Sequence, residues 1–275
     1  MNMRRRAVVI RAMTVFMAGA LLSAWGCGAV QKSRAPQETA GQEIRGPIRA
    51  GITPTYPPVI FLENGKVSGI EADLAEALSA ELKTPVVFVE KPFPELISSL
   101  VRGEIDMIMS GMSVTAKREA LVRFVRPYMH VGQMAIIRKE DRQRFAQPKE
   151  AIYVNGLRVG YQSGTTGMAF AVEKLLLAEL VKFDSAEFGL TALRDGGIEV
   201  FIHDSPTAWR IPANAAYSDL MALTAPLTRE PLAWAVRKDD KALADRLNAV
   251  LDAWKKNGRL DAIIGRWVPV SLQMK

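Results

Sequence analysis

The sequence predicts an α/β protein made of two sets of alternating strands and helices. Short β-branched segments alternate with amphipathic stretches between residues 48 and 109, and the same pattern returns between 157 and 202. Such alternation implies βαβ units and mostly parallel sheets. No long Pro/Gly linker separates the two sets. We therefore expect two lobes folded from one chain, each a mostly parallel sheet flanked by helices.

The first set begins with a strand over 48–52, which the loop Thr53–Pro58 ends. A helix is predicted over 69–82 because its apolar residues recur at helical spacing. The remaining elements of this set are a strand at 86–89, a helix at 93–101 that Gly103 ends, and a buried strand at 105–109.

The second set repeats this plan. In order, it contains a strand at 157–161, a turn at Gly164–Gly167, a helix at 168–181, a helix that ends at Gly196–Gly197, and a strand at 198–202. Apolar residues between Leu243 and Trp254 then form a helical stripe, which Asn257 and Gly258 close.

The first 26 residues have the pattern of a secretory signal. They contain four arginines and no acid, and an apolar run extends from Ala12 to Trp25. That run is shorter than the ~20 residues needed to span a bilayer, but it suits a signal core. We therefore expect residues 1–26 to be a signal peptide and the protein to be exported, to the periplasm or the cell surface.

Cys27 is the only cysteine of the chain. Leu22–Cys27 resembles a lipobox, the motif whose cysteine is lipidated, although Ala24 and Trp25 depart from that pattern. The favoured interpretation is a lipidated, membrane-anchored protein in which residues 27–47 form a flexible tether. The alternative is cleavage nearby, for instance after Ala29, which would discard the thiol.

The charge balance gives no argument for nucleic acid as a partner. The formal net charge is +7, from 36 basic and 29 acidic residues. Four of the basic residues lie in the predicted signal peptide, so its removal leaves +3. No metal-ligand cluster, phosphate-binding glycine loop or Ser-His-Asp set is evident, and we expect neither a metal nor another cofactor.

Three segments supply the polar groups that would hold a zwitterion. Ser110–Arg118 offers hydroxyls and a guanidinium, Ser163–Gly167 offers hydroxyls and backbone N–H groups at a predicted helix start, and His203–Pro206 offers a carboxylate. A guanidinium matches the two oxygens of a carboxylate, and a carboxylate pairs with an ammonium group. Donors at a helix start suit an anionic group.

From Ile48 to Pro269 the chain resembles family 3 of the bacterial extracellular solute-binding proteins, the polar amino-acid receptors of ABC importers. The resemblance implies a two-lobed, periplasmic binding protein-like (type II) fold that closes on its ligand. It also implies two crossing segments, at Gln133–Ile137 and Leu232–Val236. Lobe 1 would comprise 48–131 plus 234–275, and lobe 2 would comprise 132–233.

The resemblance also implies roles for individual residues. Arg118 would hold the ligand's α-carboxylate and Asp204 its ammonium group. Thr165 and Thr166 would face an anionic group, although the plainer interpretation is a helix N-cap. The other expected ligand-binding residues are Ser110, Met112, Ser113, Thr115, Tyr56 and Phe93.

Two further residues, His203 and Thr53, are not expected to bind the ligand through a charge. His203 is expected to pack in the interior rather than to act as a base. Thr53 stands where receptors for cationic amino acids tend to carry an acid, which tilts the expected ligand slightly towards a neutral or weakly polar amino acid.

We therefore expect a substrate-binding protein without catalytic residues, which takes a small zwitterion and works with an ABC permease of the inner membrane. Two alternatives stay open. One is a periplasmic cyclohexadienyl or arogenate dehydratase on the same fold, for which Glu173 is the available acid. The other is a sensory binding module.

Overall fold

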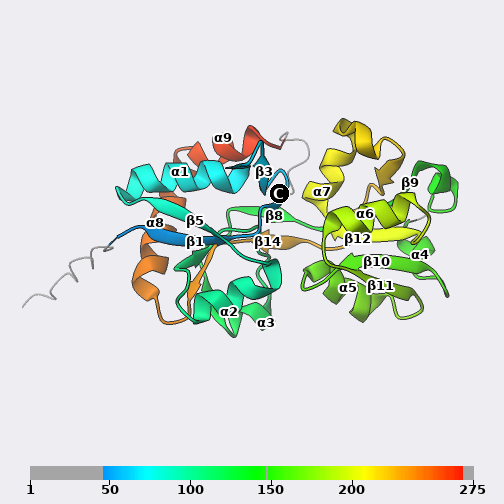
Figure 1. The fold of residues 1–275 in the computed structure, drawn as a ribbon, viewed down its shortest axis with the longest axis horizontal. Coiled ribbons are helices and arrows are strands. Elements are labelled where there is room, and N and C mark those ends of the chain that lie inside the picture. The colour runs from blue at the N-terminus through cyan, green and yellow to red at the C-terminus, as the bar shows by residue number, and fades with distance from the viewer. Residues whose placement is uncertain (1–45, 147, 269–275) are drawn as a thin grey trace, which may run out of the picture. The chain divides into compact units, whose positions relative to one another are not determined.

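The computed structural model describes residues 46–146 and 148–268. The predicted signal peptide (1–26), Cys27 and nearly all of the predicted tether (27–47) lie outside these residues. Within them the chain forms two five-stranded sheets, a two-stranded ribbon and a three-stranded sheet (Figure 1). No helix in this part of the chain is long and apolar enough to cross a bilayer.

The first large sheet has the strand order β5-β1-β6-β15-β7. Its strands are β5 (Val86–Glu90), β1 (Ile48–Ile52), β6 (Met107–Ile108), β15 (Ala235–Arg237) and β7 (Val122–Phe124). Helices α1 (Ile70–Leu82), α8 (Lys241–Lys256) and α9 (Arg259–Gly265) pack on one face, and α2 (Leu96–Val101) packs on the other (Figure 1).

Side-chain alternation divides this core into two layers. Met107 belongs to the layer that contains Leu78 and Trp254, whereas the next residue, Ile108, belongs to the layer of Leu96 and Leu100. Successive residues of a strand point to opposite faces. A strand covered by helices on both faces must therefore be apolar throughout, as the sequence of β6 is.

The second large sheet has the order β11-β10-β12-β9-β13. Its strands are β11 (Glu179–Phe183), β10 (Arg158–Gln162), β12 (Val200–Asp204), β9 (Gln133–Arg138) and β13 (Leu220–Ala222). Helix α5 (Thr166–Lys174) packs with Ile202 on one face, and α6 (Ala186–Arg194) packs with Phe201 on the other (Figure 1).

The two sheets share one plan. In each, the first three strands of the order pair in parallel, and the fourth strand pairs antiparallel with both of its neighbours. Four of the five strands in each sheet therefore run the same way, as predicted. The exceptions, β15 and β9, are the strands that the chain enters from the two-stranded ribbon.

The ribbon corrects the predicted crossing segments. It consists of β8 (Met129–Val131) paired antiparallel with β14 (Glu230–Leu232). The chain passes from β7 through β8 to β9, and returns from β13 through β14 to β15. The predicted crossing at Gln133–Ile137 is β9 itself, so the passage between the sheets lies a few residues earlier.

The predicted helix at 168–181 is wrong in its second half. Helix α5 ends at Lys174, and the residues from Glu179 onward form β11, an edge strand paired in parallel with β10. The apolar residues Leu175, Leu176 and Leu177 continue a helical pattern in the sequence, but pairing with β10 decides the conformation of the next segment. Tertiary pairing overrides local propensity here.

The remaining elements are short. They are β2 (Thr55–Tyr56), β3 (Ile60–Glu63), β4 (Lys66–Ser68), α3 (Ala116–Glu119), α4 (Pro148–Ala151), α7 (Ser205–Arg210), and the 3-10 turns η1 (Phe93–Glu95), η2 (Lys139–Gln143), η3 (Ile211–Ala213) and η4 (Ala215–Tyr217). The predicted helix at 93–101 is therefore a 3-10 turn followed by α2.

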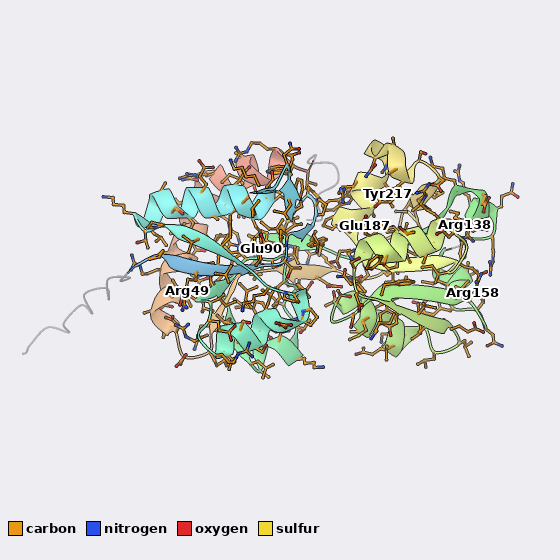
Figure 2. The ribbon with its side chains drawn as sticks, in the orientation of Figure 1. Arg49, Glu90, Arg138, Arg158, Glu187 and Tyr217 are labelled. Carbon is orange, nitrogen blue, oxygen red and sulfur yellow. The ribbon has the colours of Figure 1, made fainter. Side chains whose placement is uncertain are left out.

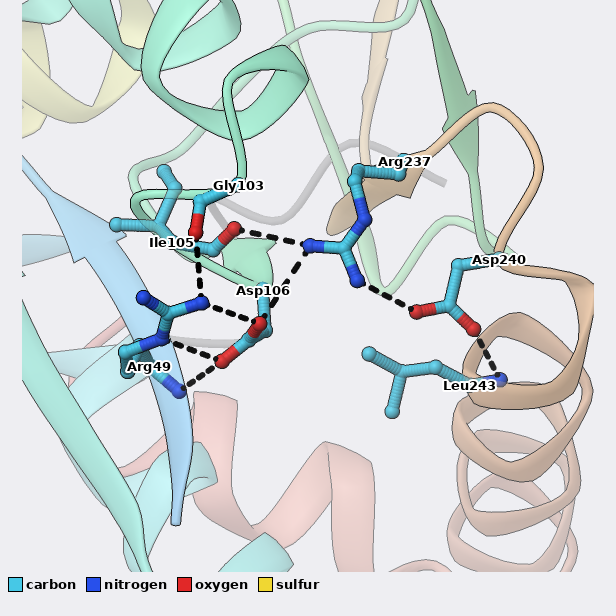
Figure 3. A network of polar contacts seen from close by, with 7 residues as sticks. All are labelled: Arg49, Gly103, Ile105, Asp106, Arg237, Asp240 and Leu243. Carbon is cyan, nitrogen blue, oxygen red and sulfur yellow. Dashed lines mark hydrogen bonds and ion pairs between the residues drawn. The ribbon is translucent and has the colours of Figure 1, made fainter. Parts of the chain in front are cut away.

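Each large sheet carries an arginine whose donors are well matched. In the second, Arg138 (labelled in Figure 2) donates to the carbonyls of Leu193 and Ile198 at 2.7 and 2.9 Å, and pairs with Asp141. In the first, Arg49 donates to both oxygens of Asp106, at 2.9 and 2.8 Å (Figure 3).

The network around Asp106 extends to a helix start. Arg237 reaches Asp106 at 3.4 Å and Asp240 at 3.3 Å, and Asp240 caps α8 by accepting from the N–H of Leu243 (Figure 3). Burial acts to raise the pKa of Asp106, but the hydrogen bonds and charge of Arg49 outweigh it and hold that pKa below its usual value. This network ties β1, β6, β15 and α8 together.

Candidate ligand-binding site

A pocket of about 490 Å³, counted with the solvent at its mouth, lies where strands of both large sheets end. Residues from the first sheet and its loops line one side: Thr53, Thr55, Tyr56, Phe93, Ser110, Gly111, Ser113 and Arg118. Residues from the second sheet line the other: Gln162, Thr165, Thr166, His203 and Asp204.

Eight of the ten ligand-binding residues expected from the sequence line this pocket. The two others are Met112 and Thr115. Met112 is 1% exposed and packs with Leu96 and Leu100 in the first core. Thr115 caps α3, with its hydroxyl accepting from the N–H of Arg118 at 3.2 Å. It supports Arg118 instead of facing the pocket.

The Arg118 guanidinium has more N–H donors than hydrogen bonds within the described residues. Its Nη1 donates to the carbonyl of Ser113 at 2.8 Å, and its Nη2 donates to the carbonyl of Gly164, across the pocket, at 3.2 Å. Its guanidinium carbon lies 5.5 Å from the centre of the Phe93 ring. Among the described residues, no carboxylate forms an ion pair with it. Burial lowers the pKa of Arg118, and nearby negative charges offset this only in part.

The loop that carries Ser110 is held in place from behind. Ser110 accepts from the N–H of Thr53 at 2.8 Å, and the N–H of Gly111 donates to Glu71 at 3.2 Å. Gly111 has φ +61°, and a Cβ there would lie 2.7 Å from the Tyr56 ring. Only glycine suits this position, on both counts.

Glu71 is fully buried, and the Tyr128 hydroxyl donates to it at 2.6 Å. Burial raises the pKa of Glu71 to about 7, against the effect of its two hydrogen bonds. Tyr128 directly precedes β8. Glu71 therefore links the Gly111 loop to the ribbon, a contact that its position at a helix start does not reveal.

The turn before α5 presents its donors to the pocket. Thr165 caps this helix: its hydroxyl accepts from the N–H of Met168 at 3.2 Å and donates to the carbonyl of Gln162 at 2.7 Å. The Thr166 hydroxyl accepts from Gln133 at 3.0 Å. The N-cap interpretation and the lining of the pocket both hold for Thr165.

Asp204 ends β12 opposite Gln133, its register partner in β9. The Gln133 amide donates to Asp204 in a short contact and to Glu230 at 3.2 Å. Burial raises the pKa of Asp204 to about 6, and the charge of Glu230 adds to this effect. Tyr56, Gln133 and Arg118 act in the opposite direction.

His203 lies in the wall of the pocket and is 4% exposed. Its ring nitrogens pair with Gln162 and Thr207, each at 2.9 Å, and its ring meets Tyr56 edge-on at 6.1 Å. Burial lowers its pKa to about 4, so it is neutral at pH 7. This agrees with the packing role expected for it.

Five lining residues were not among the ligand-binding residues expected from the sequence: Thr53, Thr55, Gly111, Gln162 and His203. Gln162 ends β10 as Asp204 ends β12, and Thr53 directly follows β1. The rule that ligands bind at the carboxyl ends of strands would have found Gln162. In the described residues, no group of His, Cys, Asp and Glu side chains could hold a metal ion.

Comparisons with known proteins agree on the family. The model of the bacterial extracellular solute-binding proteins, family 3, matches residues 48–270. ABC transporter arginine-binding protein 1 of Escherichia coli K12 is 30% identical over 239 residues, which cover 84% of this chain and 94% of that protein.

Solved structures are similar as well. An ancestral amino acid-binding protein, described as a precursor of cyclohexadienyl dehydratase, matches with 32% identity and a TM-score of 0.74, covering 81% of this chain and 95% of that one. A mutant of ArgBP from T. maritima matches with 34% identity and a TM-score of 0.73, with the same coverage. The predicted two-lobed α/β fold is confirmed. The chain belongs to the bacterial extracellular solute-binding proteins, family 3.

Proposed function

We propose that the protein binds a free amino acid in this pocket and delivers it to the permease of an ABC importer. Arg118 would hold the α-carboxylate, and Asp204 would pair with the ammonium group. One observation carries the proposal: within the described residues, the Arg118 guanidinium forms no ion pair with a carboxylate, the Asp204 carboxylate forms none with a cation, and both line one pocket. A zwitterion satisfies both.

Sheet membership supports the expected lobes, 48–131 plus 234–275 and 132–233. β1 and β15 belong to one sheet, and β9 and β12 belong to the other. The contact of Arg118 with the Gly164 carbonyl spans the pocket, so a ligand that touches both sides would favour the closed arrangement. The β8–β14 ribbon would act as the hinge.

The charges around the pocket favour a cationic amino acid, which revises the slight tilt drawn from Thr53. Thr53 lines the pocket, but its hydroxyl already donates to the carbonyl of Lys91 at 2.7 Å. Other residues supply the negative charge: the two carboxylates of Asp204 and Glu230 exceed the single positive charge of Arg118. A ligand of charge +1 would balance the site, and a relative that binds arginine supports this choice.

A panel of free amino acids, scored by the rise in melting temperature, tests the proposal. Basic amino acids should give the largest rise, and Arg118→Ala and Asp204→Ala should each abolish it while the fold survives. The same response from both variants and the parent protein would show that the site is assigned wrongly.

An enzyme on the same fold is the second candidate, because one similar structure is named as a dehydratase precursor. Glu173, the acid it would use, is exposed on α5 and does not line the pocket. Incubation with prephenate or arogenate should therefore yield neither phenylpyruvate nor phenylalanine. Formation of either product at a rate that Glu173→Gln reduces would favour the enzyme.

We also propose export and lipidation on Cys27, which would anchor the protein to a membrane. The apolar run before Cys27 and the polar stretch after it support this. Mass spectrometry of the mature N-terminus separates the two cleavage sites. A diacylated Cys27 is the expected result, and a chain that starts at Val30 would overturn it.

A further inference from the structure

Gln133 is not among the residues that line the pocket, yet it contacts two that are, Thr166 and Asp204, and also Glu230. Its side chain is fully buried at the start of β9. The amide nitrogen contacts the Thr166 hydroxyl at 3.0 Å, one oxygen of Asp204, and one oxygen of Glu230 at 3.2 Å. An amide nitrogen has two hydrogens, so these three acceptors compete for them.

Two acceptor atoms of this group lack a donor. The Gln133 amide oxygen and Oε2 of Glu230 are buried, and neither has a hydrogen-bond partner among the described residues. Thr228 donates to Oε1 of Glu230 at 2.6 Å. Two carboxylates therefore flank one neutral donor, in a region where an unmet acceptor costs free energy.

The position of Gln133 depends on Gly167. A Cβ at Gly167 would lie 2.8 Å from the Gln133 amide oxygen. The missing side chain of Gly167 thus leaves the space into which the amide reaches. Gly167 is part of the turn that carries Thr165 and Thr166, so the amide joins that turn to Asp204.

We propose that Gln133 and Glu230 are positioning residues for ligand binding: Gln133 holds Asp204 in register with Thr166, and Glu230 places a second negative charge behind Asp204. The inference rests on the proposed binding of the ligand's ammonium group by Asp204. Both residues belong to strands that flank or form the ribbon, so the ammonium end of the site is built on the hinge.

The pair acts on Asp204 in opposite directions. Donation by Gln133 favours the charged carboxylate, and the charge of Glu230 favours the protonated acid. The other groups that face Asp204 are the Arg118 guanidinium and the Tyr56 hydroxyl, which both favour the carboxylate. His203, next along β12, is neutral at pH 7 and pairs with Gln162 and Thr207.

The first test follows Asp204 directly by NMR titration of carbon-labelled aspartate in the ligand-free protein, with Asp204→Asn for assignment. Gln133→Ala should move the titration of Asp204 to higher pH, and Glu230→Gln should move it to lower pH, each by about half a pH unit or more. Movement in the same direction, or none, overturns the inference. This readout needs no ligand, so it stands even if the proposed function fails.

The second test measures L-arginine affinity by calorimetry across pH 4–9 in the full chain. The parent protein should lose affinity below about pH 6, where Asp204 takes up a proton. Gln133→Ala should weaken binding roughly 10- to 100-fold at pH 7. If the parent protein binds no amino acid of the panel, the proposed function fails and the titration alone decides the inference.

A double-mutant cycle tests the link to Gly167. Gly167→Ala should weaken binding of L-arginine by displacing the amide, but should have a smaller effect in the Gln133→Ala background, where the 2.8 Å clash with the amide is gone and the 3.2 Å approach to the Ile202 carbonyl remains. Gly265→Ala is the matched control, because that helical glycine has open space around it and should leave affinity unchanged. Additive effects of the Gly167 and Gln133 substitutions would contradict the link.

Discussion

The guanidinium groups of Arg49 and Arg118 have different partners. The guanidinium of Arg49 meets both oxygens of Asp106, and Arg237 continues the network to Asp240 (Figure 3). The guanidinium of Arg118 donates to the carbonyls of Ser113 and Gly164 and lies over the Phe93 ring. Within the described residues, Arg49 is therefore paired with a carboxylate and Arg118 is not.

Asp106 and Asp204 differ in the same way, since within the described residues one is paired with arginine and the other is not. Arg49 holds the pKa of Asp106 below its usual value, whereas burial and Glu230 raise the pKa of Asp204 to about 6. A paired carboxylate stabilises the fold above the pH at which it ionises, and a buried unpaired one destabilises it. In the described residues, paired charges such as Arg49 and Asp106 therefore lie in the scaffold, and the unpaired Arg118 and Asp204 line the pocket.

The largest expected effect is that of Arg118→Ala on affinity. Binding of the amino acid should weaken roughly 100- to 1000-fold, because a charge-assisted pair in a desolvated site is lost. The melting temperature of the ligand-free protein should change little, since the substitution removes two hydrogen bonds to carbonyls and the contact with the Phe93 ring but no ion pair of the described residues. Calorimetric titration and a thermal melt measure the two quantities. A stability loss as large as the affinity loss would make Arg118 part of the scaffold.

Asp106→Asn should show the reverse pattern. It leaves Arg49 and Arg237 without their shared counter-ion, and we expect the free energy of unfolding to fall by about 2–3 kcal/mol. The Asp106 side chain is 23% exposed and that of Arg49 41%, so the loss stays below that of a fully buried pair. Denaturant unfolding measures it, and the affinity of the folded variant should match that of the parent.

Asp204→Asn should abolish binding and yet stabilise the ligand-free protein above pH 6. The folded pKa of about 6 exceeds the unfolded value of about 3.9, so the cost of ionising the buried acid is complete only above pH 6. We expect a gain of about 1–3 kcal/mol at pH 8 that vanishes near pH 4. Unfolding curves at the two pH values decide it, and an equal gain at both would refute the charge explanation.

The smallest expected effect is the difference in ligand affinity between substitutions at two helix N-caps. Thr165 caps α5 inside the pocket, and Ser185 caps α6 without lining it. Thr165→Ala and Ser185→Ala should each lower stability by about 1 kcal/mol, but only Thr165→Ala should weaken ligand binding, by a few-fold. Equal affinities for the two variants would reduce the role of Thr165 to capping.

The sequence located pocket-lining residues best where one short segment has its own signal. Arg118 lies within a continuous motif, Thr165 precedes a helix, and Asp204 ends an apolar strand, so each could be placed without knowledge of its neighbours. Met112 and Thr115 belong to the same motif but face the core and a helix start. Spacing in a loop does not fix which side chains face outward.

Gln133 and Glu230 illustrate what local patterns do not contain. They are separated by 97 positions and meet because β8 pairs with β14 and β9 pairs with β12. Neither residue has a distinguishing neighbour in the sequence. The end of α5 and the start of β11 were missed for a similar reason, since pairing with β10 outweighs a helical pattern there.

The sequence by itself determined the alternation of strands and helices and, as predictions, the export signal and the charged groups proposed to hold a zwitterion. Those properties depend on periodicity and on short motifs, which act over a few residues. Only the tertiary structure decided which charges are paired within the described residues and which line the pocket without an ion-pair partner. Matching depends on distances between groups far apart in the chain, and the register of paired strands sets those distances.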